Sequence, residues 1–138
     1  ECPTLTFNTI GRHQSRLVRT RVASNLSPWL SKTSVGDMHT IAISHGEGRF
    51  VASDDVLAQL KTNGQIATQY VDEAGVPGMD LDVNPNGSLL AIEGITSPDG
   101  RVFGKMGHSE RYSNGTFKNV PGEKDQPLFT AGVEYFTA

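Results

Sequence analysis

Short stretches of alternating apolar and polar residues recur along the chain and predict β-strands separated by tight turns. In residues 15–23, one face holds mostly β-branched side chains and the other holds Leu17, Arg19 and Arg21. This basic face is either solvated or binds an acidic partner or a phosphate. Further strands are predicted over residues 4–10, 39–44 and 65–71, with a hairpin formed by 89–95 and 102–106. The pattern favours a strand-rich fold with antiparallel hairpins.

Two stretches have helical periodicity instead. Ser53 is suited to be a helix N-cap, because its hydroxyl can accept a hydrogen bond from an unpaired amide, and two aspartates follow it. An apolar stripe comes next, and Asn63-Gly64 ends the helix. Residues 128–136 have apolar spacing that allows a second short helix. Asn-Pro-Asn-Gly at 84–87 is a strong turn signal, since proline fixes φ and glycine supplies a positive φ.

Composition limits the classes of protein that the chain can represent. With 138 residues, of which 36% are hydrophobic, it can bury a core, and we interpret residues 1–138 as a single partial domain. The net charge of −3 argues against a nucleic-acid partner, and no apolar run is long enough to cross a membrane. Cys2 is the only cysteine, which excludes an internal disulfide and fits a reducing, cytoplasmic setting. The chain begins with Glu1 rather than methionine, which suggests a cut end.

Few residues have the spacing that metal or nucleotide sites require. The four histidines are not paired at metal-ligand distances along the sequence, and there is no cysteine cluster. The glycine-rich stretches match neither a phosphate-binding loop nor a dinucleotide fingerprint. We therefore expect neither metal nor cofactor in this chain.

His108 and Glu110 form the most suggestive pair for catalysis. They follow a predicted strand and are two residues apart, so an extended backbone would point both side chains the same way. A carboxylate that accepts from one ring nitrogen fixes the tautomer, and the other nitrogen can then act as a general base. This arrangement supplies two members of a Cys-His-Glu triad. The alternative is an ordinary surface histidine beside a glutamate.

Cys2 is poorly suited to be the nucleophile of such a triad. A reactive cysteine is typically found at a sharp turn into a helix, whose amino end lowers the pKa of the thiol. Cys2 is instead followed by Pro3 and a strand pattern. We expect it to be either a structural cysteine or one that is present only because of the cut end.

Several motifs, in order along the chain, resemble the class I (triad-type) glutamine amidotransferases. Residues 104–111, Gly-Lys-Met-Gly-His-Ser-Glu-Arg, are similar to the His-Pro-Glu-Arg segment that closes the triad of that family. The stretches at 40–50, 84–88 and 91–95 are similar to segments of its purine-biosynthetic branch. The likeness runs from about Leu5 to Arg111. It implies an α/β, flavodoxin-like domain, of which this chain would be the carboxyl-terminal part.

The resemblance also implies an activity. The domain would hydrolyse glutamine through a cysteine thioester, with His108 as general base and acid and Glu110 orienting it. Ser44, His45 and Gly46 would contact the glutamine; otherwise, this segment is only a tight exit from a strand. The ammonia would pass to an ATP-dependent synthetase domain, which holds the ATP and Mg²⁺ and converts formylglycinamide ribonucleotide to the amidine. The alternative is a non-catalytic docking or interaction module of a synthetase.

Two departures from the family pattern qualify the expected activity. Ser109 replaces the proline usual between the histidine and the glutamate, which makes that loop less rigid while keeping the His-x-Glu pair. The family's Gly-x-Cys-x-Gly turn should lie upstream of Leu5 and is not found in this chain. We therefore expect residues 1–138 alone to be inactive and to need the upstream glutaminase segment. The exposed sheet surface should either make the fragment self-associate or retain the missing segment.

Overall fold

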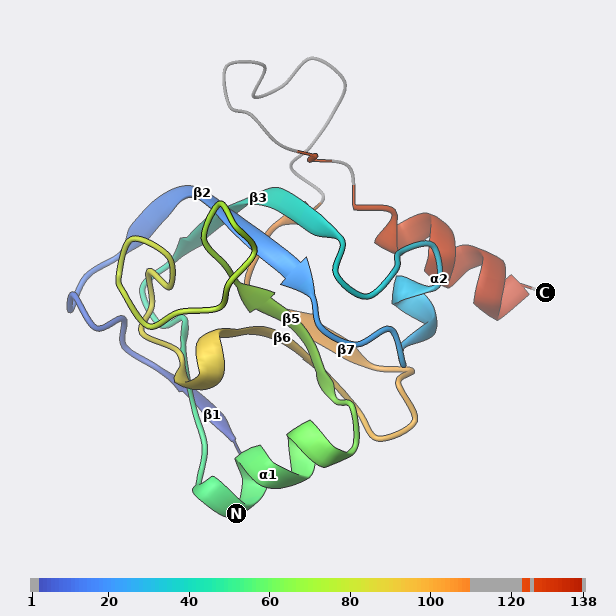
Figure 1. The fold of residues 1–138 in the computed structure, drawn as a ribbon, viewed down its shortest axis with the longest axis horizontal. Helices are drawn as coiled ribbons and strands as arrows, with labels where there is room; N and C mark the ends of the chain where they lie inside the picture. Colours follow the sequence, from blue (N-terminus) through green and yellow to red (C-terminus); the bar gives the residue numbers. More distant parts are fainter. Residues whose placement is uncertain (1–2, 110–122, 125, 138) are drawn as a thin grey trace.

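The computed structural model describes residues 3–109, 123–124 and 126–137 (Figure 1). Its centre is a five-stranded antiparallel sheet with the strand order β3-β2-β5-β6-β7. These strands are β2 (Gln14–Val22), β3 (Met38–His45), β5 (Ile66–Tyr70), β6 (Ile92–Thr96) and β7 (Phe103–Lys105). A smaller antiparallel sheet pairs β1 (Thr4–Thr6) with β4 (Arg49–Val51). The predicted strand-rich architecture with antiparallel hairpins is confirmed.

Both predicted helices are present, together with two short 3₁₀ turns. These elements are α1 (Asp54–Thr62), α2 (Leu128–Thr137), η1 (Pro28–Leu30) and η2 (Leu89–Ala91). Ser53 is the N-cap of α1, and its hydroxyl accepts from the Val56 amide at 3.4 Å. The helix ends at Asn63 and Gly64, whose φ of 69° is one that glycine adopts readily. Figure 1 shows α2 beside η1, at the opposite side of the sheet from α1.

The alternation along β2 places its side chains as the sequence predicts. Val18, Thr20 and Val22 are buried, whereas Arg19 and Arg21 are only partly buried. The β-branched face of β2 contributes to two of the clusters that form the core. The basic face therefore remains partly accessible to solvent.

Two predicted strands are shorter than their patterns suggest, and backbone geometry explains both. The strand expected over 4–10 ends at Thr6, because the chain then turns and the Asn8 amide donates to the Gly46 carbonyl at 3.0 Å. The strand expected from residue 89 begins only at Ile92. Leu90 and Ala91 adopt φ values of 52° and 54°, which are incompatible with extended pairing.

The hairpin of β6 and β7 comes just before His108, the predicted general base. Its turn closes through the Ser97 amide, which donates to the Val102 carbonyl at 2.9 Å, and Gly100 has a φ of 77°. Gly94 pairs with Lys105 across the hairpin. Directly after β7, the chain reaches His108.

Within the described residues, no helix has the length and apolar character needed to cross a membrane.

Candidate active site

The backbone of His108 is fixed next to β3, an edge strand of the sheet. Its backbone N–H donates to the Ala42 carbonyl at 2.7 Å and forms an isolated antiparallel bridge with β3. Ala42 is followed, within the same strand, by Ser44 and His45. The fold thus brings together two predicted site segments that are more than 60 residues apart in the sequence.

The Ser44–His45–Gly46 segment is held by the side chain of Asn8, which is only 2% exposed. Asn8 Nδ2 donates to the His45 carbonyl at 2.8 Å, and Asn8 Oδ1 accepts from the Gly48 amide at 3.0 Å. The Asn8 amide completes the set through its bond to the Gly46 carbonyl. One buried amide side chain and its backbone therefore fix the exit from β3.

The His45 imidazole lies in a polar network behind this segment. Asn86 Nδ2 is 3.3 Å from His45 Nε2 and donates to the Tyr70 hydroxyl at 2.7 Å. The Asn86 amide therefore joins the His45 ring to the Tyr70 hydroxyl. A Cβ on Gly48 would lie 2.4 Å from the ring, so the backbone packs against it only because this residue is glycine.

Electrostatic interactions join His45 to the other ionisable groups nearby. Burial is the main reason that the pKa of His45 is lowered, and positive charge on His13 or His108 acts in the same direction, while Glu93 opposes it. The pKa of Tyr70 is raised well above its ordinary value, mainly by burial and secondly by the negative charge of Glu93. His45 is therefore neutral near pH 7, in the form that can accept a proton.

The lowered pKa of His45 predicts that the folded protein loses stability as the pH falls below about 6.5. Between the folded and unfolded pKa values, the unfolded state binds more protons, so the free energy of unfolding rises with pH there and levels off above. His45→Gln should remove this contribution. Denaturant unfolding of both proteins at about pH 7.5 and 5.5 measures the effect. The same pH-dependent loss in both proteins would contradict the prediction.

His13 lies near His45 and His108, and we call these three residues the histidine cluster. The position of His13 in the sequence did not identify it as a member. Its Nε2 is 3.1 Å from the Ser44 hydroxyl, and its ring is exposed. The contact depends on the pairing of β2 with β3, in which Gln14 faces His45. The alternation of β2 and β3 was visible in the sequence, but their mutual register was not.

Glu93 is a second residue that sequence reasoning did not single out. It lies on β6, is 3% exposed, and accepts from the Met106 and Gly107 amides just before His108. Carboxylates are rarely buried unless they are paired. A glutamate within the apolar run of residues 91–95 was therefore a signal that could have identified it.

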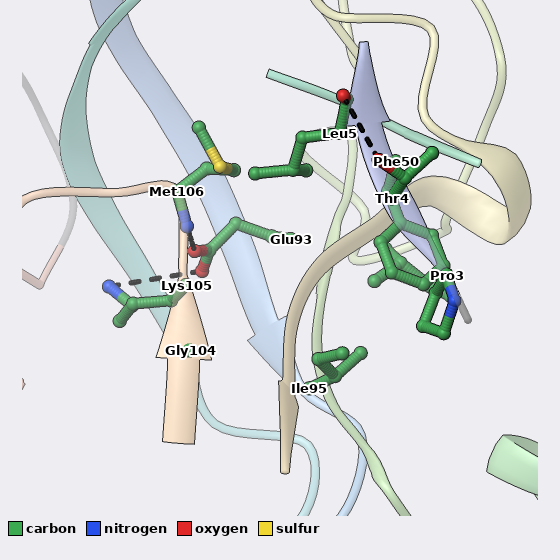
Figure 2. Close-up of a pocket in the computed structure, with 10 residues that line it drawn as sticks. Pro3, Thr4, Leu5, Phe50, Glu93, Ile95, Gly104, Lys105 and Met106 are labelled. Carbon is green, nitrogen blue, oxygen red and sulfur yellow. Dashed lines mark hydrogen bonds and ion pairs between the residues drawn. The ribbon is translucent and has the colours of Figure 1, made fainter. Parts of the chain in front are cut away.

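A groove of about 560 Å³ adjoins Glu93 (Figure 2). It lies between the β1–β4 sheet and the β6–β7 hairpin, and apolar side chains form most of its wall. Figure 2 shows the Glu93 carboxylate between Met106 and Lys105, with Leu5 and Phe50 on the other side. His108 and His45 are not among its lining residues, so this groove and the histidines are separate features rather than one site.

Two of the residues considered in the sequence, Glu110 and Cys2, lie outside the described residues. Within the described part of the chain, no three histidine, cysteine or acidic side chains are grouped so that they could hold a metal ion. The placed candidates are His108, Ser44, His45 and Gly46; His108 lies beside Ala42 within β3, and the other three lie at the carboxyl end of that strand.

Comparisons with known proteins show which family this chain resembles. The family model for the CobB/CobQ-like glutamine amidotransferase domain matches residues 1–136. Phosphoribosylformylglycinamidine synthase subunit PurQ of Thermomicrobium roseum is 42% identical over 91 residues, which are 66% of this chain and 38% of that protein. The same subunit of Methanosarcina barkeri is 35% identical over 133 residues, 96% of this chain and 55% of that protein.

A solved structure is similar over nearly the whole chain. The structure of PurLQS from Thermotoga maritima matches with a TM-score of 0.70 and 28% identity, covering 99% of this chain and 54% of the matched one. The chain spans about half the length, or less, of the curated relatives described here.

Proposed function

The chain belongs to the family of CobB/CobQ-like glutamine amidotransferase domains, and we propose that it is part of a glutaminase that supplies ammonia for phosphoribosylformylglycinamidine synthesis. Family membership confirms the resemblance found in the motifs around His108 and Ser44. The match to a solved structure over 99% of the chain confirms the predicted α/β glutamine amidotransferase fold. The comparisons give no support to the alternative of a non-catalytic docking module.

The observation that carries the proposal is the bridge between His108 and β3. The His108 amide donates to the Ala42 carbonyl, which brings its side chain to the strand that ends in Ser44 and His45. A general base beside a polar, glycine-containing strand end suits a planar amide substrate. We assign glutamine contact to Ser44, His45 and Gly46, and the orientation of the imidazole to Glu110.

The proposed reaction has two steps that share one histidine. His108 removes the proton from a cysteine thiol, and the thiolate attacks the side-chain amide carbon of glutamine. As the C–N bond breaks, the imidazolium returns the proton to the departing nitrogen, which leaves as ammonia. Neutral His108 then takes a proton from water, whose oxygen attacks the thioester, and the proton returns to the sulfur as glutamate is released. We assign the cysteine to a part of the glutaminase that this chain does not include.

We further propose that the ammonia is used by a synthetase partner, which binds the ATP and Mg²⁺. The support is that the relatives are named as a subunit of the synthase, and that the similar solved structure is one of PurLQS. The synthetase would convert formylglycinamide ribonucleotide to the amidine. We place this activity in the cytoplasm, because the one cysteine of residues 1–138 cannot form a disulfide within them, which fits a reducing compartment.

The test compares glutamine with ammonium chloride as the nitrogen source. Residues 1–138 alone should not hydrolyse glutamine, whereas the same residues within the intact glutaminase should, and ammonium chloride should support amidine formation by the synthetase in either case. Release of glutamate measures hydrolysis. Sustained hydrolysis by residues 1–138 with a thioester on Cys2 would refute the split of the triad, and an intact protein unable to use glutamine would refute the glutaminase.

A further inference from the structure

The segment that carries His108 is held on its amino-terminal side by one buried carboxylate. Oε2 of Glu93 accepts from the Met106 amide at 2.8 Å and from the Gly107 amide at 3.0 Å. The Met106 amide also donates to the Glu93 backbone carbonyl at 3.1 Å, whereas Oε2 is the acceptor described for the Gly107 amide. The Glu93 side chain has no solvent exposure, and hydrogen bonds to a charged acceptor are stronger than neutral ones. These two bonds fix the direction of the backbone immediately before His108.

The other oxygen of Glu93 is also engaged. Oε1 accepts from the Thr68 hydroxyl at 3.0 Å, and the Lys105 ammonium lies 3.8 Å from it. Thr68 is on β5, Glu93 on β6 and Lys105 on β7, so the carboxylate is tied to three successive strands of the sheet. A group held in this way cannot turn without breaking several interactions, which makes it a rigid support for the two amides.

Lys105 holds the segment on the other side of His108. Its ammonium donates to the Ser109 hydroxyl at 2.8 Å and to Gln126 Oε1 at 3.0 Å. The Ser109 hydroxyl donates to the same Gln126 oxygen at 2.6 Å. Gln126 is 5% exposed and precedes α2, so Ser109 is connected to a part of the chain that is distant in sequence.

We propose that Glu93 and Lys105 are positioning residues for His108. Glu93 fixes the backbone up to Gly107, Lys105 fixes Ser109, and the bridge to Ala42 fixes His108 between them. Neither side chain needs to touch the substrate, because each acts by setting where the imidazole lies. This inference rests on the proposed function, in which His108 transfers the protons.

The test compares two replacements of Glu93 in the intact glutaminase. Glu93→Gln keeps an oxygen that can accept from both amides, and its amide nitrogen can donate to the Thr68 hydroxyl. Glu93→Met has a similar size but no strong acceptor. We expect the Met variant to lower kcat for glutamine hydrolysis by about 10- to 100-fold with little change in KM, and the Gln variant to stay within about threefold of wild type.

Three further measurements separate positioning from general loss of structure. Amidine formation from ammonium chloride should be unchanged in both Glu93 variants, and Glu134→Gln, on the exposed part of α2, is the matched control for loss of a carboxylate. Lys105→Met should lower kcat by a smaller factor than Glu93→Met. If Glu93→Met does not fold, Lys105→Met decides the matter, since a wild-type kcat in that variant would overturn the proposal.

The outcomes distinguish this proposal from the function on which it rests. If the wild-type protein hydrolyses glutamine and His108→Ala does not, the proposed function stands. A folded Glu93→Met protein with wild-type kcat then overturns the positioning role alone, as does a Gln variant that is as impaired as the Met variant. If the wild-type protein does not hydrolyse glutamine, both proposals fail together.

Discussion

Replacement of His108 by alanine is expected to lower glutamine hydrolysis by at least about 10²–10⁴-fold, while amidine formation from ammonium chloride continues at the wild-type rate. The imidazole takes part in both proposed steps, first as base and acid in thioester formation and then in hydrolysis of the thioester. Alanine removes proton transfer from both. The synthetase does not depend on His108 once ammonia is supplied. Amidine formation should therefore be lost with glutamine as the nitrogen source and kept with ammonium chloride.

His13→Ala is the comparison that gives this result its meaning. His13 belongs to the same histidine cluster, but its ring is exposed and its described contact is with the Ser44 hydroxyl. Replacement of His13 should lower the rate of glutamine hydrolysis much less than replacement of His108. Steady-state glutamate release by the two variants, with unfolding midpoints measured in parallel, makes the comparison. Equal losses in both variants, or a loss of ammonium-dependent synthesis in His108→Ala, would contradict the assigned role.

The part of this fold that could be predicted from the sequence is the part that local chemistry determines. Helix α1 has an N-cap at Ser53, two early acids and a C-terminal Asn63-Gly64, so each end is specified within a few residues. The β6–β7 hairpin is determined in the same way by its turn at 97–100. His108 was identifiable because a histidine two residues before a glutamate, directly after a strand, already suggests a catalytic pair.

The features that escaped prediction depend on contacts between distant segments or on unusual backbone geometry. His13 meets Ser44 only through the pairing of β2 with β3, and a shift of one residue in that register would separate them. The left-handed conformations of Leu90 and Ala91 are rare outside glycine, so no residue preference would have suggested them. Glu93 was visible as an acid in an apolar strand, but its partners at 106 and 107 follow only from the hairpin register.

Asn84→Ala is expected to lower the free energy of unfolding by about 2–4 kcal/mol, the largest loss of stability that we expect from a single polar residue here. Asn84 is fully buried. Its Nδ2 donates to the Ser88 carbonyl at 2.8 Å, and its Oδ1 accepts from the Ser88 amide at 3.0 Å. Alanine would leave the Ser88 amide unpaired in the interior, and the Ser88 carbonyl would keep only its bond from the Ala91 amide at 3.2 Å.

The substitution should also disturb the histidine cluster, because the Asn84–Ser88 loop is hydrogen-bonded to residues 48–50 and contacts His45. The Ser88 hydroxyl accepts from the Phe50 amide at 2.9 Å and donates to the Gly48 carbonyl at 3.2 Å. Asn86, in the same loop, contacts His45. Asn63→Ala, at the exposed end of α1, is the matched control and should cost less than about 1 kcal/mol by denaturant unfolding. Equal losses for the two variants would contradict the role assigned to the side chain of Asn84 in holding the loop.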